Sequence, residues 1–462
     1  MSKCSNRAKK AIELGAIGYQ MLPHFNKKLS ISILKKPKLQ CPVFRHMTTT
    51  TKHPRIPIVD LSKPMSEISA LVHEALSDTG FMYVRNAAIS KQHIESVLSM
   101  SRKFFTECDS SVKRTVEDPI SAFRGYYVYK GTQSNVLHSN DNIECFSIGK
   151  ECANPYSLRS EYFKRNGLPE SIWKAGISKP NQWPKLPSQQ FTKEFRETMQ
   201  SYYNACVDTS TQILRLIAYS LGMTGEDVDY FLQFHNKWDC NLEPKFYPKF
   251  SVQKTEEKIR LSEHRDLTSI TLLVQDQLSG LQVWDDHSHE WIDAPLSLSS
   301  GEGIILCNTG DFMAMWTGGL YKSTLHRVKA SPFHSHHGPI EALDRISVVF
   351  FAWPNHEAVI QPLQRFTSTS HPPITCGDLM PFCYNNYNVS SVFVFALLNY
   401  LHFWRKKKQV MMLSFLFKVI ILLRRETNIA ISGKANSLNY FVRKIQFGYS
   451  VHQSCLSQFI KY

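Results

Sequence analysis

Short stretches of β-forming residues beyond Asp239 constrain the fold of this chain more than any other feature of its sequence. Ile, Val, Leu and aromatic residues are concentrated in runs that are separated by Gly, Asp or Pro. The clearest runs are 268–274, 280–284, 304–307 and 346–352. Several strands of this length and spacing predict a β-sandwich or barrel. The chain is 43% hydrophobic, which is ample for a packed core and excludes a disordered protein.

Helical patterns dominate the part of the chain before these strands. Short strands are expected at 55–60 and 80–84, and apolar residues recur at three- and four-residue steps in 65–77, 92–105 and 191–221. We therefore predict four regions. They are a basic extension at 1–55, a mostly helical support at 56–235, a β core at 236–385, and a basic and apolar tail of unknown role at 386–462.

The formal net charge of +15 is confined to the two ends of the chain. Residues 1–55 contain 12 Lys and Arg and one acidic residue, and residues 386–462 contain 11 and one. The segment between them carries 31 basic and 37 acidic residues, so it is mildly acidic. A basic surface for nucleic acid is therefore not expected on the body of the protein, and we predict no nucleic-acid partner.

The cysteines and the two ends bear on where the protein works. The 11 cysteines include no C-x-x-C pair, so we expect free thiols in a reducing compartment and a cytoplasmic location. The Lys-rich start is similar in composition to a mitochondrial presequence, but we favour a solvated basic tail. The apolar runs at 392–404 and 410–423 are shorter than the roughly 18–20 residues of a spanning helix. Membrane association through this tail stays an alternative that is not favoured.

Two histidines and an aspartate form the candidate metal site. His264 and Asp266 are two residues apart, so in a strand both side chains point to the same side. His326 lies in a distant strand-like segment and supplies a second imidazole. Two imidazoles and a carboxylate on one face of a metal suit Fe(II), because the remaining positions stay open for an organic cosubstrate and O₂.

Arg345 and Ser347 have the same two-residue spacing. A guanidinium group beside a hydroxyl fits a carboxylate, through charge-assisted hydrogen bonds. Each piece alone has an ordinary explanation: H-x-D in a surface turn, a core histidine, or a salt-bridged strand arginine. Taken in order, with strand-like segments around each, the five residues predict one site.

In these motifs the sequence resembles the isopenicillin-N-synthase-like family of Fe(II)/2-oxoglutarate-dependent dioxygenases. The resemblance runs from about Ile56 to Leu363. Its motifs include Ile56-Pro-Ile-Val-Asp60, Arg124-Gly125-Tyr126, Phe246-Tyr-Pro248, His264-Arg-Asp266, Asn308-Thr-Gly-Asp311, Lys322-Ser-Thr-Leu-His-Arg-Val328 and Arg345-Ile-Ser347. The resemblance implies a mainly β fold with flanking helices, in which a double-stranded β-helix (jelly roll) forms the core and the N-terminal region supports it.

The resemblance also implies roles for individual residues. His264, Asp266 and His326 would ligate Fe(II). Arg345 and Ser347 would bind the distal carboxylate of 2-oxoglutarate, helped by the hydroxyl of Tyr247. No catalytic residue is singled out beyond the metal ligands.

Three features depart from the family pattern. Lys245 stands where the family often has Asn, and it could form an ion pair or face solvent. The segment 330–344 is long and carries His334, His336 and His337, which we interpret as an exposed loop rather than a second metal site. The third departure is the tail after 386, which puts in doubt the helix that the family places over the site.

The resemblance implies an oxidoreductase that uses Fe(II), 2-oxoglutarate and O₂ and releases succinate and CO₂. Hydroxylation is the default outcome, with desaturation or ring closure as alternatives. Some relatives use iron and O₂ without 2-oxoglutarate, and an inactive jelly-roll binding protein is the alternative from another class. We expect a small organic substrate, pocket walls around 123–129 and 138–146 and in the loop after Val328, and a monomer.

Overall fold

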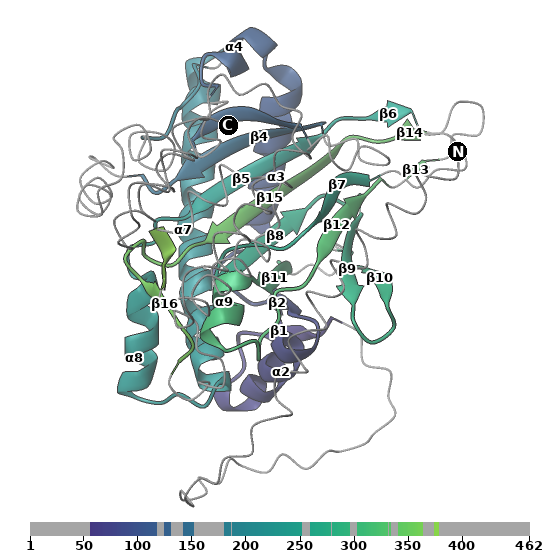
Figure 1. The fold of residues 1–462 in the computed structure, drawn as a ribbon. Coiled ribbons are helices and arrows are strands. Elements are labelled where there is room, and N and C mark those ends of the chain that lie inside the picture. The colour runs from purple at the N-terminus through teal and green to yellow at the C-terminus, as the bar shows by residue number, and fades with distance from the viewer. Residues whose placement is uncertain are drawn as a thin grey trace, which may run out of the picture. The chain divides into compact units, whose positions relative to one another are not determined.

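A large β-sheet forms the centre of the computed structural model (Figure 1). Its central strands come from the C-terminal half of the chain, and the strands at both edges come from the N-terminal half. The structure describes residues 56–117, 124–130, 142–151, 180–185, 187–251, 259–278, 280–295, 303–330, 332–333, 341–363 and 374–377. All of them belong to one compact unit that begins at Pro54. The predicted extension at 1–55 and the tail at 386–462 lie outside the described residues.

The large sheet has eight strands, and only its β1–β2 pair is parallel. In spatial order the strands are β1 (Ile58–Asp60), β2 (Phe81–Arg85), β11 (Ile305–Thr309), β8 (Ile270–Gln275), β15 (Arg345–Ala352), β5 (Asn241–Tyr247), β4 (Asn142–Gly149) and β3 (Gly125–Lys130). The strands β1 to β4 come from the region predicted as a mostly helical support. The large sheet thus crosses the predicted boundary at residue 235, and the four-region division stays a prediction.

A second sheet has four strands, all from the predicted β core. Its strands in spatial order are β10 (Glu290–Asp293), β9 (Leu281–Asp285), β12 (His326–Lys329) and β7 (Ile259–His264). Two small sheets are formed by β13 (Pro332–Phe333), β14 (Glu341–Ala342) and β6 (Phe250–Ser251), and by β16 (Val359–Ile360) and β17 (Ile374–Thr375). The strands predicted at 268–274, 280–284, 304–307 and 346–352 correspond to β8, β9, β11 and β15 within two residues at each end.

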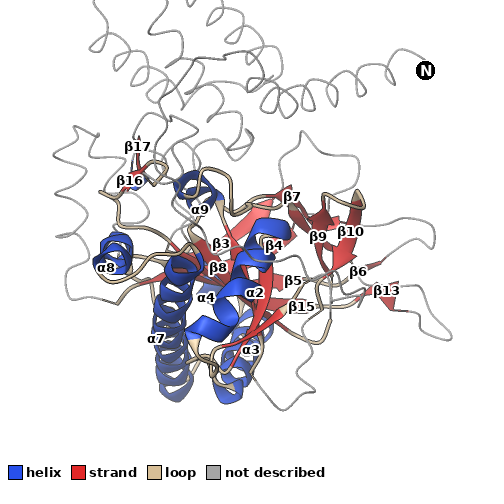
Figure 2. Ribbon diagram, turned by 90° about the horizontal axis from the view of Figure 1, so that it is seen from below, coloured by secondary structure: helices blue, strands red, loops and turns tan. Residues whose placement is uncertain are grey.

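Helices cover the face of the large sheet that is turned away from the small one (Figure 2). They are α2 (Met65–Asp78), α3 (Lys91–Glu107), α4 (Ser110–Arg114), α7 (Gln189–Ser220), α8 (Glu226–Leu232), η4 (Gln233–His235) and α9 (Asp311–Trp316), of which α2, α3 and α7 contact the large sheet. Ser90 and Ser188 begin α3 and α7 by accepting hydrogen bonds from the backbone N–H three residues on. Gly222 follows the end of α7 with φ 75°, the left-handed conformation that Gly adopts most easily.

The two faces of the large sheet are buried in two different hydrophobic clusters. On β15, Ile346, Val348 and Phe350 pack under the helices, whereas Val349 belongs to the cluster between the two sheets. We call this second cluster the inner cluster; its members include Phe81, Tyr127, Cys145, Tyr247, Leu273, Val283, Leu306 and Val328. Because both faces are covered, nearly every residue of β8, β11 and β15 is buried, instead of every second one. The predicted β core with flanking helices is confirmed.

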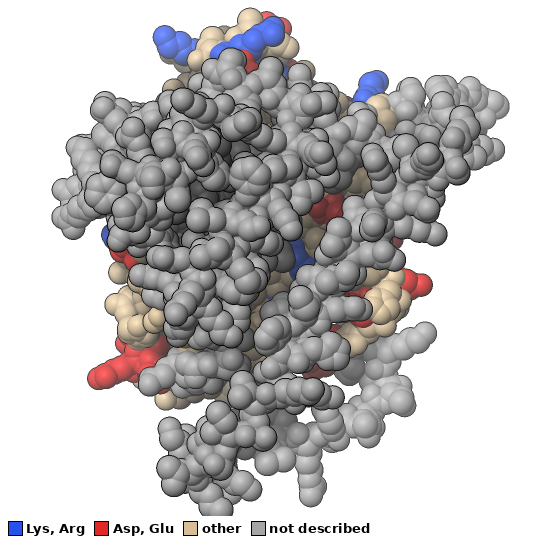
Figure 3. Space-filling view, in the orientation of Figure 1, with Lys and Arg blue, Asp and Glu red and all other residues tan. Residues whose placement is uncertain are grey.

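The described surface carries charge of both signs in separate groups. An acidic group lies over α8 in the space-filling view (Figure 3), and the first turn of that helix contains Glu226, Asp227 and Asp229. Acidic side chains at a helix N-terminus also interact favourably with the helix dipole. No helix in the described part of the chain combines the length and the apolar character needed to cross a membrane.

Candidate active site

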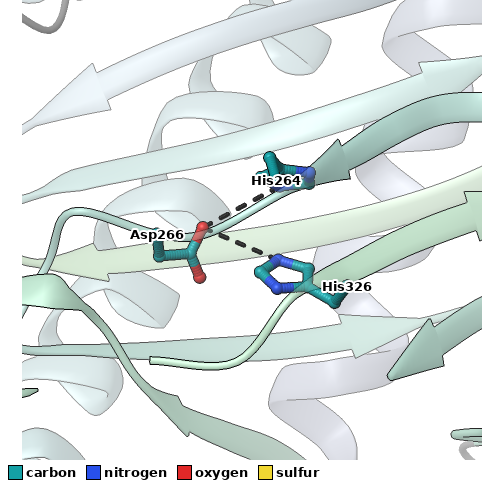
Figure 4. Close-up of side chains that lie close together, drawn as sticks. All are labelled: His264, Asp266 and His326. Carbon is teal, nitrogen blue, oxygen red and sulfur yellow. Dashed lines mark ion pairs between the residues drawn. The ribbon is translucent and has the colours of Figure 1, made fainter. Parts of the chain in front are cut away.

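His264, Asp266 and His326 converge at the ends of two neighbouring strands of the small sheet (Figure 4). His264 is the last residue of β7 and pairs directly with His326, the first residue of β12. Oδ1 of Asp266 lies 3.9 Å from Nε2 of His264 and 3.7 Å from Nε2 of His326. One ligand atom from each residue lies within 4.8 Å of the other two. Among the described residues this is the one group of His, Cys, Asp and Glu side chains that could hold a metal ion.

Asp266 lies beside His264 as predicted, but strand alternation is not the reason. Strand β7 ends at His264, so Asp266 lies in the segment after the strand. The backbone N–H of Asp311 donates to the carbonyl oxygen of Asp266 (2.8 Å) and fixes this segment against the start of α9. Gly310 allows that approach, because a Cβ there would lie 2.7 Å from the Asp266 carbonyl oxygen and 2.3 Å from that of Thr268.

Backbone carbonyl groups orient both imidazole rings. Nδ1 of His264 lies 2.8 Å from the carbonyl oxygen of Ser262, and Nδ1 of His326 lies 3.1 Å from that of Thr324. A carbonyl oxygen accepts only, so Nδ1 of each ring carries a proton and Nε2 is the nitrogen turned toward Asp266. Desolvation, followed by the charge of the nearby His326, lowers the pKa of His264 to about 4, although the side chain is still 36% exposed.

The carboxylate of Asp266 is held from the opposite side by the large sheet. Nδ2 of Asn308 donates to Oδ2 (2.8 Å), and the side chain of Thr271, paired with Asn308 across β8 and β11, also donates to the carboxylate. Burial opposes ionisation of Asp266, but the two histidines and these hydrogen bonds outweigh it and lower its pKa. The sequence motif Asn308-Thr-Gly-Asp311 marked this segment, but reasoning from sequence assigned Asn308 no role.

Arg345 is buried with part of its hydrogen-bonding capacity unused. It is the first residue of β15, and its guanidinium carbon lies 4.7 Å from the centroid of the Tyr247 ring. Nη2 donates to Oε1 of Gln275, whereas Nε and Nη1 are buried and find no hydrogen-bond partner among the described residues. Buried donors without an acceptor are costly, and an anion at this position would remove the cost. Ser347, two residues on and also buried, lies on the same side of β15.

A second arginine adds positive charge behind Tyr247. Nη1 of Arg260 donates to the carbonyl oxygen of Tyr247 (2.9 Å), and Nη2 donates to that of Leu343. Burial, followed by the charge of Arg345, lowers the pKa of Arg260 to about 10, so it stays charged at neutral pH. Two guanidinium groups near one tyrosine suit an anionic ligand.

The predicted residues therefore lie in two groups that face the space between the sheets. Tyr247, which contacts Arg345, belongs to the inner cluster, and so does Phe81, whose ring centroid lies 5.6 Å from that of His326. Two imidazoles and a carboxylate on one side of a metal fit Fe(II) with open coordination positions. The histidines at 334, 336 and 337 lie outside the described residues.

Two histidines and one carboxylate in a jelly-roll fold are the ligand set of non-haem Fe(II) oxygenases. Two family models match the chain: the 2OG-Fe(II) oxygenase superfamily over residues 232–354, and the non-haem dioxygenase in morphine synthesis N-terminal model over residues 56–186. The chain belongs to the Fe(II)/2-oxoglutarate-dependent dioxygenases, in their isopenicillin-N-synthase-like branch, as the sequence motifs predicted. It is an oxidoreductase that uses Fe(II), 2-oxoglutarate and O₂.

Individual relatives are similar at modest identity over most of the described core. A 2-oxoglutarate-Fe(II) type oxidoreductase, ppzD, of Metarhizium majus is 28% identical over 317 residues, covering 68% of this chain and 86% of the relative. The homoarginine-6-hydroxylase 2-ODD-C23.1 of Arabidopsis thaliana is 27% identical, covering 67% and 87%. The crystal structure of a full-length Neurospora crassa protein in complex with alpha-KG matches with a TM-score of 0.57 and 26% identity, covering 70% of this chain and 93% of that one.

Proposed function

We propose that His264, Asp266 and His326 hold Fe(II) in this enzyme. We further propose that Arg345 and Ser347 bind the distal carboxylate of 2-oxoglutarate beside Tyr247. The reaction is then the hydroxylation of a small organic molecule, with release of succinate and CO₂. Bound iron supplies the centre at which 2-oxoglutarate is decarboxylated and O₂ is activated.

The residues of this chain contribute orientation and charge. The carbonyl groups of Ser262 and Thr324 keep the Nε2 lone pairs of the two histidines available to the metal. Asn308 leaves Oδ1 of Asp266 for the metal by occupying Oδ2. Arg345 would anchor the far end of the cosubstrate through a bidentate interaction and so fix its other end toward the metal ligands. The apolar inner cluster limits the access of water to the reacting groups.

The observation that carries the proposal is the incomplete hydrogen bonding of Arg345. Two of its buried nitrogens have no acceptor in the part of the chain that the structure describes, although the residue is only 2% exposed. A purely structural arginine at this burial would have its donors satisfied. A carboxylate ligand supplies the missing acceptors in the interior that the three metal ligands also face.

Oxygen uptake and succinate formation, measured together, test the assignment. With Fe(II) and 2-oxoglutarate we expect His264→Ala and Asp266→Ala to abolish both, since each removes one of three metal ligands. His287→Ala is the matched control, because that histidine is exposed and pairs with Asp78 at the surface. Iron binding and 2-oxoglutarate turnover that survive both ligand substitutions would show that these residues are not the ligands.

A hydroxylated product incorporates one oxygen atom, which mass spectrometry after reaction under ¹⁸O₂ detects. A product that has lost two hydrogens and gained no oxygen would indicate desaturation or ring closure instead.

A further inference from the structure

A buried ion pair lies on the inward face of β5, beside the proposed cosubstrate site. Nζ of Lys245 lies 2.8 Å from Oε2 of Glu243, and the two side chains are 14% and 9% exposed. Burying two charges costs free energy that the pair alone regains only in part. Neither residue is part of the metal site or of the proposed carboxylate clamp, so the pair requires its own explanation.

Strand register places Lys245 in a row that crosses five strands. Lys245 pairs with Ser347 on one side and with Cys145 on the other. Ser347 in turn pairs with Gln275, and Cys145 with Tyr127. Directly paired residues of antiparallel strands project from the same face of the sheet. Tyr127 and Cys145 belong to the inner cluster, so the whole row faces the space between the sheets.

The ammonium group of Lys245 extends away from Arg345. It contacts Glu243 and lies 5.7 Å from the centroid of the Phe351 ring. Phe351 is six residues along β15 from Arg345, which corresponds to about 20 Å of strand. Phe351 also pairs with Thr271, whose side chain donates to the metal ligand Asp266. Lys245 thus reaches toward the level of the metal ligands, where the organic substrate has to bind.

The pair offers a donor and an acceptor side by side. The two hydrogen bonds that Glu243 accepts, from Lys245 and from the hydroxyl of Tyr127 (3.2 Å), both use Oε2. Among the described residues, Nζ of Lys245 also makes a 3.9 Å contact with the Cys145 sulfur. An ammonium group has three N–H donors. The hydrogen bonds to Glu243 thus run through Oε2, and Oε1 of Glu243 and a further N–H of Lys245 can serve a ligand.

We propose that Lys245 and Glu243 bind the head group of a free amino acid, with its carboxylate on Lys245 and its ammonium group on Glu243. A lone carboxylate would place Lys245 between two anions, and a lone ammonium group would place Glu243 between two cations. A zwitterion instead gives each charge of the pair one new opposite partner, so no charge is left uncompensated. This inference rests on the proposed function, because it names the substrate class of the same site.

Succinate release stimulated by added compounds tests the inference. The twenty protein amino acids are assayed with Fe(II), 2-oxoglutarate and O₂, and each one that stimulates is compared with its des-amino acid and its decarboxylated amine. For phenylalanine these are 3-phenylpropanoate and phenethylamine. We expect the amino acid to exceed both analogues by about tenfold or more in kcat/KM, because each analogue lacks one charge-assisted hydrogen bond.

Variants separate recognition from a structural role. Lys245→Met should remove the preference over the amine, and Glu243→Gln the preference over the des-amino acid. The double variant removes both charges together, so it avoids leaving one buried charge unpaired. Lys249→Met is the control, because Lys249 is exposed two residues after Tyr247. A structural ion pair would lower turnover of all three compounds by the same factor and leave their ratios unchanged, which would overturn the inference.

The two proposals fail in different ways. A wild-type protein that forms no succinate even with Fe(II) and 2-oxoglutarate would contradict the proposed function. Iron-dependent succinate formation that no amino acid stimulates, or that both analogues stimulate equally, would overturn the amino-acid site and leave the proposed function standing.

Discussion

Asn308 provides the most direct test of how the sheet supports the metal ligands. Its Nδ2 donates to Oδ2 of Asp266 at 2.8 Å, and the residue is only 4% exposed. Asn308→Ala removes this hydrogen bond without touching a ligand atom. Asp266 then keeps the hydrogen bond from Thr271 but loses the one that occupies Oδ2 and directs Oδ1 toward the metal.

The expected effect is a weaker metal site in a folded protein. Loss of a hydrogen bond that orients a metal ligand typically lowers metal affinity by about 10- to 100-fold. That range corresponds to about 1.4–2.7 kcal/mol of binding free energy. Folding without metal should be destabilised by about 1–3 kcal/mol, because the substitution leaves part of a buried carboxylate without its donor.

Anaerobic calorimetric titration with Fe(II) measures the iron affinity. Urea unfolding measures the stability of the metal-free protein. Asn86→Gly is the matched control: Asn86 also donates from Nδ2 to an aspartate, Asp60, at 2.8 Å, but at an exposed position. Glycine is chosen because Asn86 has φ 54°, which Gly adopts without strain. An iron affinity for folded Asn308→Ala within about threefold of that of the wild type would refute the reasoning.

Three further outcomes follow from buried groups. Arg345→Met should raise the KM for 2-oxoglutarate by about tenfold or more and leave the Fe(II) affinity unchanged. In thermal unfolding, the metal-free variant should be at least as stable as the wild type, because Nε and Nη1, which have no acceptor among the described residues, are gone. Burial lowers the pKa of His235 to about 3, so between pH 6.5 and 3 the unfolded chain binds a proton that the folded chain does not. The free energy of unfolding should therefore fall by about 2 kcal/mol between pH 7 and pH 5 because of this group. Urea unfolding at the two pH values should show that His235→Gln lacks this part of the decrease. Gly310→Ala should cost roughly 1–3 kcal/mol in urea unfolding and also weaken iron binding, because its Cβ would press on the Asp266 backbone; unchanged stability would contradict the close packing of this turn.

Much of the site could be predicted from sequence because its ligands come from short local patterns. The two-residue spacing of His264 and Asp266 indicated two metal ligands, and that of Arg345 and Ser347 indicated a carboxylate site. The structure places the members of each pair on one side of the backbone. The cause differs for Asp266, which lies beyond the end of β7 and is positioned by a contact with α9. Strand alternation cannot predict where a strand stops.

The features that sequence did not reveal depend on long-range pairing. Asn308 reaches Asp266 because β11 and β8 are neighbours in the sheet, and the Cys145 and Ser347 neighbours of Lys245 follow from the register of β4, β5 and β15. No local pattern reports which strands pair. The apparent change of texture near residue 235 reflects local helix content, whereas the large sheet joins segments from both sides of it.

The origin of the two sheet edges has a consequence for how this chain can be divided. β11 needs β2 as its outer neighbour, and β5 needs β4. A fragment starting near residue 236 would leave β11 and β5 unpaired at the two opposite edges of the same sheet, and such edges promote aggregation. During synthesis, β2 and β4 are made before β11 and β5, so they can pair with these strands only after more of the chain has been synthesised. Expression boundaries for this enzyme therefore belong outside the interval from Ile56 to Ile360, and fragments cut within it are expected to be insoluble.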